Sequence, residues 1–86
     1  MPPPGIVNVI APTTGQIIWT MAGVDEDECF VETNEVIVSL SSCKMEIPVS
    51  APASGHCRFY ALPGQVVEAG GLLAKINTAR TKEPEN

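Results

Sequence analysis

The chain has three lysines, and only one of them lies where its amine would be presented for covalent chemistry. Lys82 lies in a polar C-terminal segment and Lys75 in the middle of an alternating apolar run. Lys44 lies between two such runs, in a predicted turn. A lysine has a long flexible stem and an amine that attacks acyl groups when deprotonated. We therefore single out Lys44 as the candidate for acylation, with an ordinary solubilising turn lysine as the alternative.

The other reactive side chains form no catalytic or metal-binding pattern. Cys29, Cys43 and Cys57 are odd in number and lack C-x-x-C spacing, so neither a disulfide framework nor a zinc site is predicted. We expect Cys29 and Cys57 to be small buried hydrophobic residues in a reducing compartment, and Cys43 to be either a redox-sensitive thiol or a simple substitution. His56 is expected on a strand surface, and the acidic run 25–28 in a solvated loop.

Size and charge exclude several classes of function. The 86 residues, 44% hydrophobic and 17% charged, form one small domain at most, too small for a deep substrate cleft with its own catalytic residues. The net charge is −5 and the few Lys and Arg residues are scattered, which argues against nucleic acid or a membrane surface as partner. No apolar run has the length of a transmembrane helix. We expect a cytoplasmic protein, or one of an organelle matrix if the chain is part of a longer one.

Apolar residues alternate with period two, which predicts short β-strands and no helix. Pro-rich and Gly-rich turns separate the strands. Pro48 lies in an outward-facing set, which requires an edge strand. On the last strand, Leu73 and Lys75 are assigned to the outward-facing set. The prediction is an all-β domain over residues 6–77, a sandwich or flattened barrel, after a Pro-rich leader (1–5) and before a polar tail (78–86). The alternating runs are 36–41, 45–50, 57–61 and 72–77.

An internal repeat indicates two similar halves. Ala-Pro-Thr-Thr-Gly at 11–15 recurs as Ala-Pro-Ala-Ser-Gly at 51–55, and each copy is followed by an aromatic residue, Trp19 or Phe59. Further along, Val-Glu and an apolar run at 31–40 match 67–76. Such a repeat predicts two antiparallel sheets related by a pseudo-two-fold axis. The junction between the halves, Ser41 to Met45, is then a hairpin turn that carries Lys44.

The residues around Lys44 resemble the attachment region of the biotinyl/lipoyl domain family. Cys-Lys-Met-Glu-Ile-Pro-Val at 43–49, followed by Ala-Pro-x-x-Gly, is similar to the Met-Lys-Met region of biotin-dependent carboxylases. The resemblance, with the repeat, covers nearly all of residues 6–77. Lipoyl domains have Asp-Lys-Ala at this turn, so Lys44 with Met45 and Glu46 favours biotin over lipoate. Cys43 stands where the family usually has Met, and Ser41-Ser42 where it commonly has Glu-Ala or Glu-Ser.

The resemblance implies a non-catalytic biotin carboxyl carrier, with biotin joined by an amide to Lys44 and flanked by Cys43 and Met45. Its implied partners are a biotin protein ligase, a biotin carboxylase and a carboxyltransferase. The mobile arm would shuttle carboxyl groups between the last two. Two alternatives remain: a lipoyl carrier of a 2-oxoacid dehydrogenase complex, and an unmodified β-sandwich that serves as an interaction module.

Overall fold

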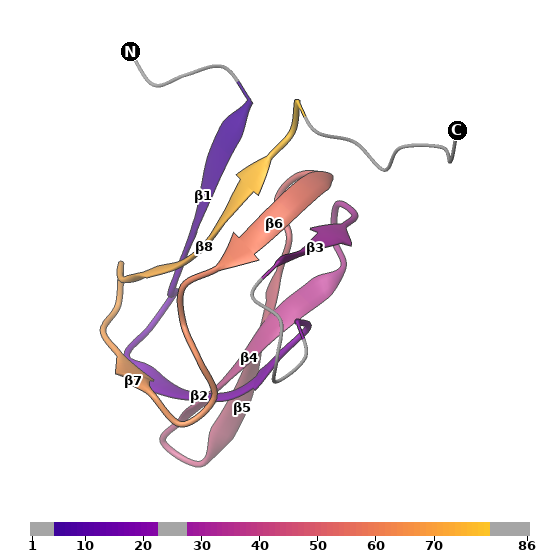
Figure 1. Ribbon diagram of the computed structural model, residues 1–86. Coiled ribbons are helices and arrows are strands. Elements are labelled where there is room, and N and C mark those ends of the chain that lie inside the picture. Colours follow the sequence, from indigo (N-terminus) through magenta and orange to yellow (C-terminus); the bar gives the residue numbers. More distant parts are fainter. Residues whose placement is uncertain (1–4, 23–27, 80–86) are drawn as a thin grey trace.

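The computed structural model describes residues 5–22 and 28–79, which fold into eight strands (Figure 1). Most of the predicted leader and tail, and residues 25–27 of the acidic run, lie outside the described residues. Within the described ranges no helix is long and apolar enough to cross a membrane. The strands are β1 (Ile6–Ile10), β2 (Gly15–Thr20), β3 (Glu28–Val31), β4 (Val36–Ser42), β5 (Met45–Ser50), β6 (Gly55–Phe59), β7 (Val66–Val67) and β8 (Leu72–Asn77).

The strands form two four-stranded antiparallel sheets, with the orders β1-β8-β6-β3 and β5-β4-β2-β7. The second half of the chain repeats the first, so β1 corresponds to β5, β2 to β6, β3 to β7 and β4 to β8. Each sheet therefore combines strands from both halves in the same order. The predicted all-β sandwich with a pseudo-two-fold repeat is confirmed. Pro48 lies on β5, which is an edge strand as expected.

The core follows the same symmetry. Ile37 and Leu73 are fully buried and correspond at an offset of 36 residues, as do Leu40 and Ile76. Burying such a side chain contributes roughly 1.5–3 kcal/mol, so one layer of paired apolar residues stabilises a domain of this size. The largest fully buried side chains are Ile17, Val31, Ile37, Val38, Leu40, Cys57, Leu73 and Ile76.

Two equivalent bulges break the predicted alternation. On β4, the register with β5 shifts between Val36 and Val38. On β8, the register with β1 shifts between Leu72 and Ala74, so that Leu73 is the extra residue. A bulge inserts one extra residue and re-aims its side chain. Ile37 and Leu73 are thereby turned into the core, whereas Val36 and Leu72 are 41% and 38% exposed. The assignment of Leu73 to the outward-facing set is therefore wrong.

The two aromatic positions of the repeat are not equivalent in burial. Phe59 is 5% exposed and belongs to the core, but Trp19 is 46% exposed. A third register shift, between Ile17 and Trp19 on β2, turns the indole outward. Trp19 lies in register with Ser39 on β4, and Ser39 pairs on its other side with Pro48 on β5.

The Ala-Pro-x-x-Gly turns of the two halves are held by matching hydrogen bonds, each to the other half of the chain. The Thr14 hydroxyl accepts a hydrogen bond from the Ala69 N–H at 3.1 Å, and Ser54 accepts the equivalent one from Thr33 at 2.9 Å. Gly15 and Gly55 then start β2 and β6 where another strand passes very close. A Cβ at Gly15 would lie 2.7 Å from the Ser41 carbonyl oxygen. The Gly of each repeat copy is thus a point of backbone contact that tolerates no side chain.

We expect Gly15→Ala to lower the free energy of unfolding by about 2–3 kcal/mol, because the new methyl group must displace backbone atoms. The measurement is urea unfolding followed by tryptophan fluorescence. Gly64→Asn is the control, since a Cβ at Gly64 meets nothing within 4 Å and Asn accepts the positive φ there. Its cost should stay below about 1 kcal/mol. Equal losses in the free energy of unfolding for the two variants would contradict the close approach of Gly15 to the Ser41 carbonyl.

Candidate functional site

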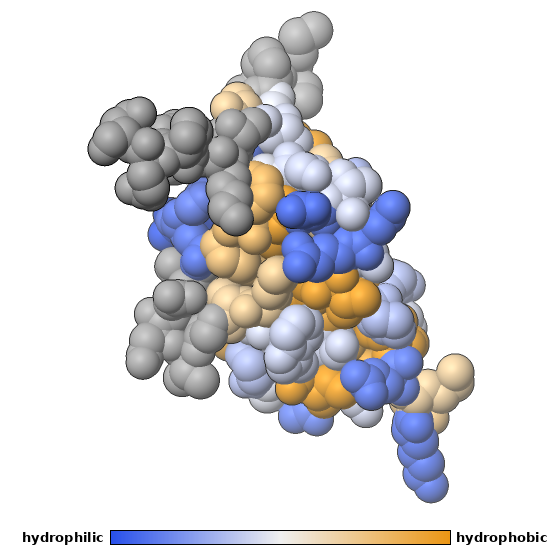
Figure 2. Space-filling model, turned by 90° about the vertical axis from the view of Figure 1, so that its right-hand side faces the viewer, coloured by the Kyte–Doolittle hydropathy of each residue, from blue (hydrophilic) through white to orange (hydrophobic). Residues whose placement is uncertain are grey.

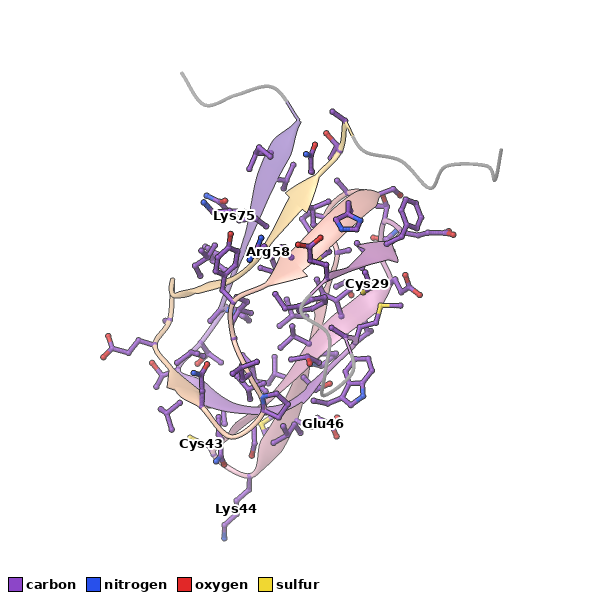
Figure 3. All side chains as sticks on the ribbon, viewed as in Figure 1. Cys29, Cys43, Lys44, Glu46, Arg58 and Lys75 are labelled. Carbon is purple, nitrogen blue, oxygen red and sulfur yellow. The ribbon has the colours of Figure 1, made fainter. Side chains whose placement is uncertain are left out.

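Lys44 lies at the tip of the β4–β5 hairpin. Ser42 pairs with Met45 at the end of the ladder, so that only Cys43 and Lys44 connect the two strands. Figure 3 shows the Lys44 side chain extending away from the body of the molecule, beyond the end of both strands. The seven residues of β4 and six of β5 are paired along their length, which fixes the base of the side chain on a rigid support.

Both residues of the turn have a left-handed backbone. The φ angles of Cys43 and Lys44 are 51° and 68°. Two-residue hairpin loops with both φ angles positive are type I′ turns, which match the twist of the flanking strands and favour Asn-Gly. A residue with a Cβ costs roughly 1–2 kcal/mol in this conformation. Two adjacent unfavourable residues at the tip of a hairpin are a form of backbone strain that often marks a functional site.

The hairpin tip is open to solvent. Cys43, Lys44, Met45 and Glu46 are all exposed, and the Met45 side chain, at 64%, is among the most exposed large apolar groups of the described residues. No hydrogen bond or ion pair within the described ranges restrains the Lys44 amine. Figure 2 shows a narrow projection at one end of the molecule, below a surface where hydrophobic and hydrophilic residues alternate in small patches. An enzyme that binds the β4–β5 turn can therefore reach the Lys44 amine without displacing any described part of the domain.

The ends of the folded unit lie far from this tip. Gly5 accepts hydrogen bonds from the backbone and the hydroxyl of Thr78, which joins the start of β1 to the end of β8. In Figure 1 this junction is at the top and the β4–β5 hairpin at the bottom. The two are pseudo-symmetric equivalents, because β1 and β8 correspond to β5 and β4. The symmetry of the fold thus separates the Gly5–Thr78 junction from the candidate attachment residue.

Lys75 lies in a different environment. It is exposed on β8, but this strand is central in its sheet, with Asn8 and Arg58 as register partners on either side. Its ammonium lies 5.8 Å from the centre of the Tyr60 ring, within the range of a cation–π contact. The sequence-based distinction between a presented Lys44 and a mid-strand Lys75 agrees with these positions. The role of Lys44 in modification stays a prediction, as do those of Cys43 and Met45.

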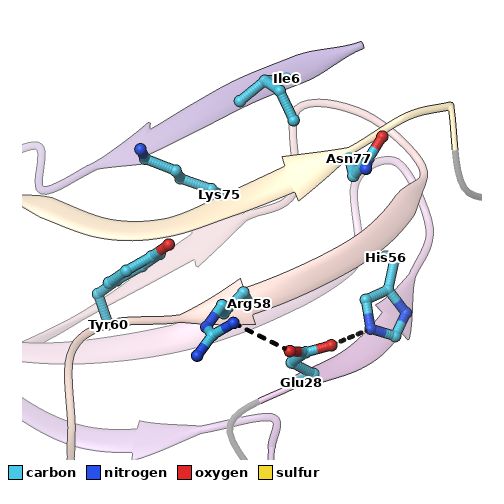
Figure 4. A pocket seen from close by; sticks show the side chains of 7 residues that line it. All are labelled: Ile6, Glu28, His56, Arg58, Tyr60, Lys75 and Asn77. Atoms are coloured by element: carbon cyan, nitrogen blue, oxygen red, sulfur yellow. Dashed lines mark hydrogen bonds and ion pairs between the residues drawn. The ribbon is translucent and has the colours of Figure 1, made fainter.

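A shallow pocket of about 200 Å³ lies on the outer face of the β1-β8-β6-β3 sheet (Figure 4). The Glu28 carboxylate bonds to the His56 ring and lies 3.4 Å from the Arg58 guanidinium, so these three side chains satisfy one another. The assignment of Glu28 to a solvated loop is wrong: it begins β3 and is half-buried. Its register with Arg58 depends on which strands pair, and no local sequence signal shows that.

The cysteines divide into three environments. Cys43 is exposed, Cys29 is partly buried and Cys57 is fully buried. Burial, with the nearby charge of Cys29 as a smaller cause, raises the pKa of Cys57 from 9.0 to about 12. The buried hydrophobic role predicted for Cys57 is confirmed, whereas Cys29 is only half enclosed. Among residues 5–22 and 28–79, no group of three His, Cys, Asp or Glu side chains is placed to hold a metal ion.

Comparisons with known proteins match the fold and the sequence pattern. Residues 7–76 match the biotin/lipoyl family described as "Biotin-requiring enzyme". A solved single-chain, multi-domain long-chain acyl-CoA carboxylase is similar in fold, with a TM-score of 0.72 and 24% identity. The similarity covers 94% of this chain but only 8% of that carboxylase, so this chain corresponds to a small part of it. No curated protein sequence matches.

The strained turn yields a test of its geometry. Cys43→Asn should raise the free energy of unfolding by about 0.5–1 kcal/mol, because Asn adopts positive φ more readily than other residues with a Cβ. Cys43→Ala is the matched control, since it removes the thiol but keeps the conformational penalty. Urea unfolding of both variants measures the difference. A gain in Cys43→Ala equal to that in Cys43→Asn would show that the thiol, and not the backbone, limits stability.

Proposed function

The chain belongs to the biotin/lipoyl attachment domain family, and on that premise we propose that it is a biotin carboxyl carrier with biotin attached to Lys44. The observation that carries the proposal is the position of Lys44 at the exposed tip of a rigid two-residue turn. Amide formation requires an amine that a ligase can enclose, and Lys44 meets that requirement better than Lys75, whose strand is flanked on both sides.

The geometry also suits a carrier that visits two active sites. A long side chain on a fixed turn keeps its attached group mobile, while the paired strands below hold the base still. Gly5 and Thr78, where the folded unit begins and ends, lie at the opposite end of the domain, so a tether that continues from them would start away from the tip. Tethering raises the effective concentration of the group at each partner site. Such a carrier needs no catalytic residues of its own, because the cofactor supplies the chemistry.

Residues beside Lys44 favour biotin over lipoate. Met45 and Glu46 follow the lysine as in biotin carriers, and the Asp-Lys-Ala of lipoyl domains is absent. Met45 is exposed and in register with Ser42, so it can form part of the surface that a biotin protein ligase recognises. The bound biotin ring would accept and release a carboxyl group, while this chain presents it.

The proposed partners are a biotin carboxylase and a carboxyltransferase. The description of the similar structure as an acyl-CoA carboxylase is in keeping with them. They and the chain would act in the cytoplasm, or in an organelle matrix if the chain is part of a longer one.

Incubation of the full chain with biotin, ATP and a biotin protein ligase should add one biotinyl group. Lys44→Arg should abolish the addition, because the guanidinium keeps the charge but forms no stable amide under these conditions. Lys75→Arg, the matched control, should be modified as fully as the parent chain. Intact-mass spectrometry measures the increment and peptide mapping locates it.

Other outcomes contradict the proposal. Addition of a lipoyl group by a lipoate ligase, with none by the biotin ligase, would assign the chain to the lipoyl carriers. Absence of any increment in a chain that unfolds cooperatively would assign it to unmodified interaction modules. Full biotinylation of Lys44→Arg would place the attachment site elsewhere.

A further inference from the structure

Cys29 and Cys57 lie directly opposite each other on neighbouring strands. They are register partners in the antiparallel β3–β6 pair, between the Glu28–Arg58 and Phe30–His56 pairs. Register partners project to the same face of a sheet, and here that face is the inner one, since Cys57 is fully buried and Cys29 packs against the core. The two cysteines are 28 positions apart in the sequence, so the sequence alone does not show that they are neighbours.

The spacing of such partners fits a disulfide bond. Opposite residues of an antiparallel pair have Cα atoms about 4.5–5.5 Å apart. Disulfides span Cα separations of about 4.4–6.8 Å, so the bond needs little backbone movement. The proximity of Cys29 also contributes, after burial, to the raised pKa of the Cys57 thiol.

We propose that Cys29 and Cys57 form a redox-modification site, at which a low-molecular-weight disulfide oxidises the two thiols to a cross-strand disulfide. The Cys29 thiolate, on the edge strand and partly exposed, attacks one sulfur of the oxidant and releases its other half as a thiol. The Cys57 thiolate then attacks the Cys29 sulfur and releases the second half. Two protein thiols lose two electrons and their protons, and one small disulfide becomes two thiols.

The order of attack follows from burial. Cys57 has no exposed surface and its pKa is about 12, so it makes a poor first nucleophile for an oxidant in solution. Once Cys29 carries the mixed disulfide, Cys57 is held beside it. The short distance offsets the low fraction of thiolate, because the second step is intramolecular.

The bond would fix an edge strand that is paired along one side only. β3 has four residues and pairs only with β6, while the Glu28 contacts with His56 and Arg58 anchor its first residue. A disulfide at the second residue would close a loop that contains β4, the attachment turn and β5. Such a loop restricts the unfolded chain without contact with Lys44. The modification site therefore does not rest on the function proposed for the turn.

The test uses the folded full chain with Cys43→Ser, which removes the exposed thiol. Incubation with oxidised glutathione should remove two hydrogen masses and leave no glutathione adduct. Non-reducing peptide mapping should join the Cys29 and Cys57 peptides. The Tm should rise by on the order of 10 °C and return on reduction.

Two further variants are the controls. Cys57→Ala and Cys29→Ser, each with Cys43→Ser, should show no internal bond and no reversible rise in Tm. If the folded chain keeps both thiols under conditions that oxidise the urea-unfolded chain, the proposal is wrong. A stable glutathione adduct on Cys29 that Cys57 does not displace would equally overturn it.

Discussion

The two-sheet architecture depends on two buried alanines, Ala11 and Ala51, at which the chain crosses from one sheet to the other. The Ala11 N–H donates to the Gly71 carbonyl at 2.8 Å, and its carbonyl accepts from Gly70 at the same distance; Ala51 makes the equivalent pair of bonds with Glu35 and Asn34. A buried backbone group without a partner is costly, so these four bonds fix where each crossing occurs. They tie each of these two crossings to a turn of the other half of the chain.

These four hydrogen bonds explain how so small a chain can hold a strained hairpin at its tip. The crossings set the register of β2 and β6, and the close approach of Gly15 to Ser41 aligns β4 beneath them. With β4 held along its length and β5 paired to it, the ladder reaches Ser42 and Met45 and leaves two residues to close the turn. The left-handed backbone of Lys44 is thus imposed by paired strands and not selected by the residue itself.

Much of this arrangement is readable from sequence, because the repeat and the alternation report on local structure. The repeat predicted two equivalent sheets, and Pro48 predicted an edge strand. The junction between the two halves predicted a turn that carries Lys44. Three features could not be predicted from the sequence, because bulges and cross-strand partners are determined by packing between segments that are distant in the chain. The burial of Leu73, the exposure of Trp19 and the register of Cys29 with Cys57 all depend on that packing. Neither Cys43 nor Lys44 is a usual type I′ residue, so the turn type had no local signal.

The proposed carrier function requires that Lys44 carries the cofactor and that this cofactor is biotin. The most direct measurement is peptide mass spectrometry of the chain isolated from its own cells, without added ligase. If Lys44 carries biotin, the peptide that contains Lys44 has a biotinyl group and Lys75 is unmodified. A lipoyl group on Lys44, or a biotinyl group on Lys75 with Lys44 unmodified, would contradict it.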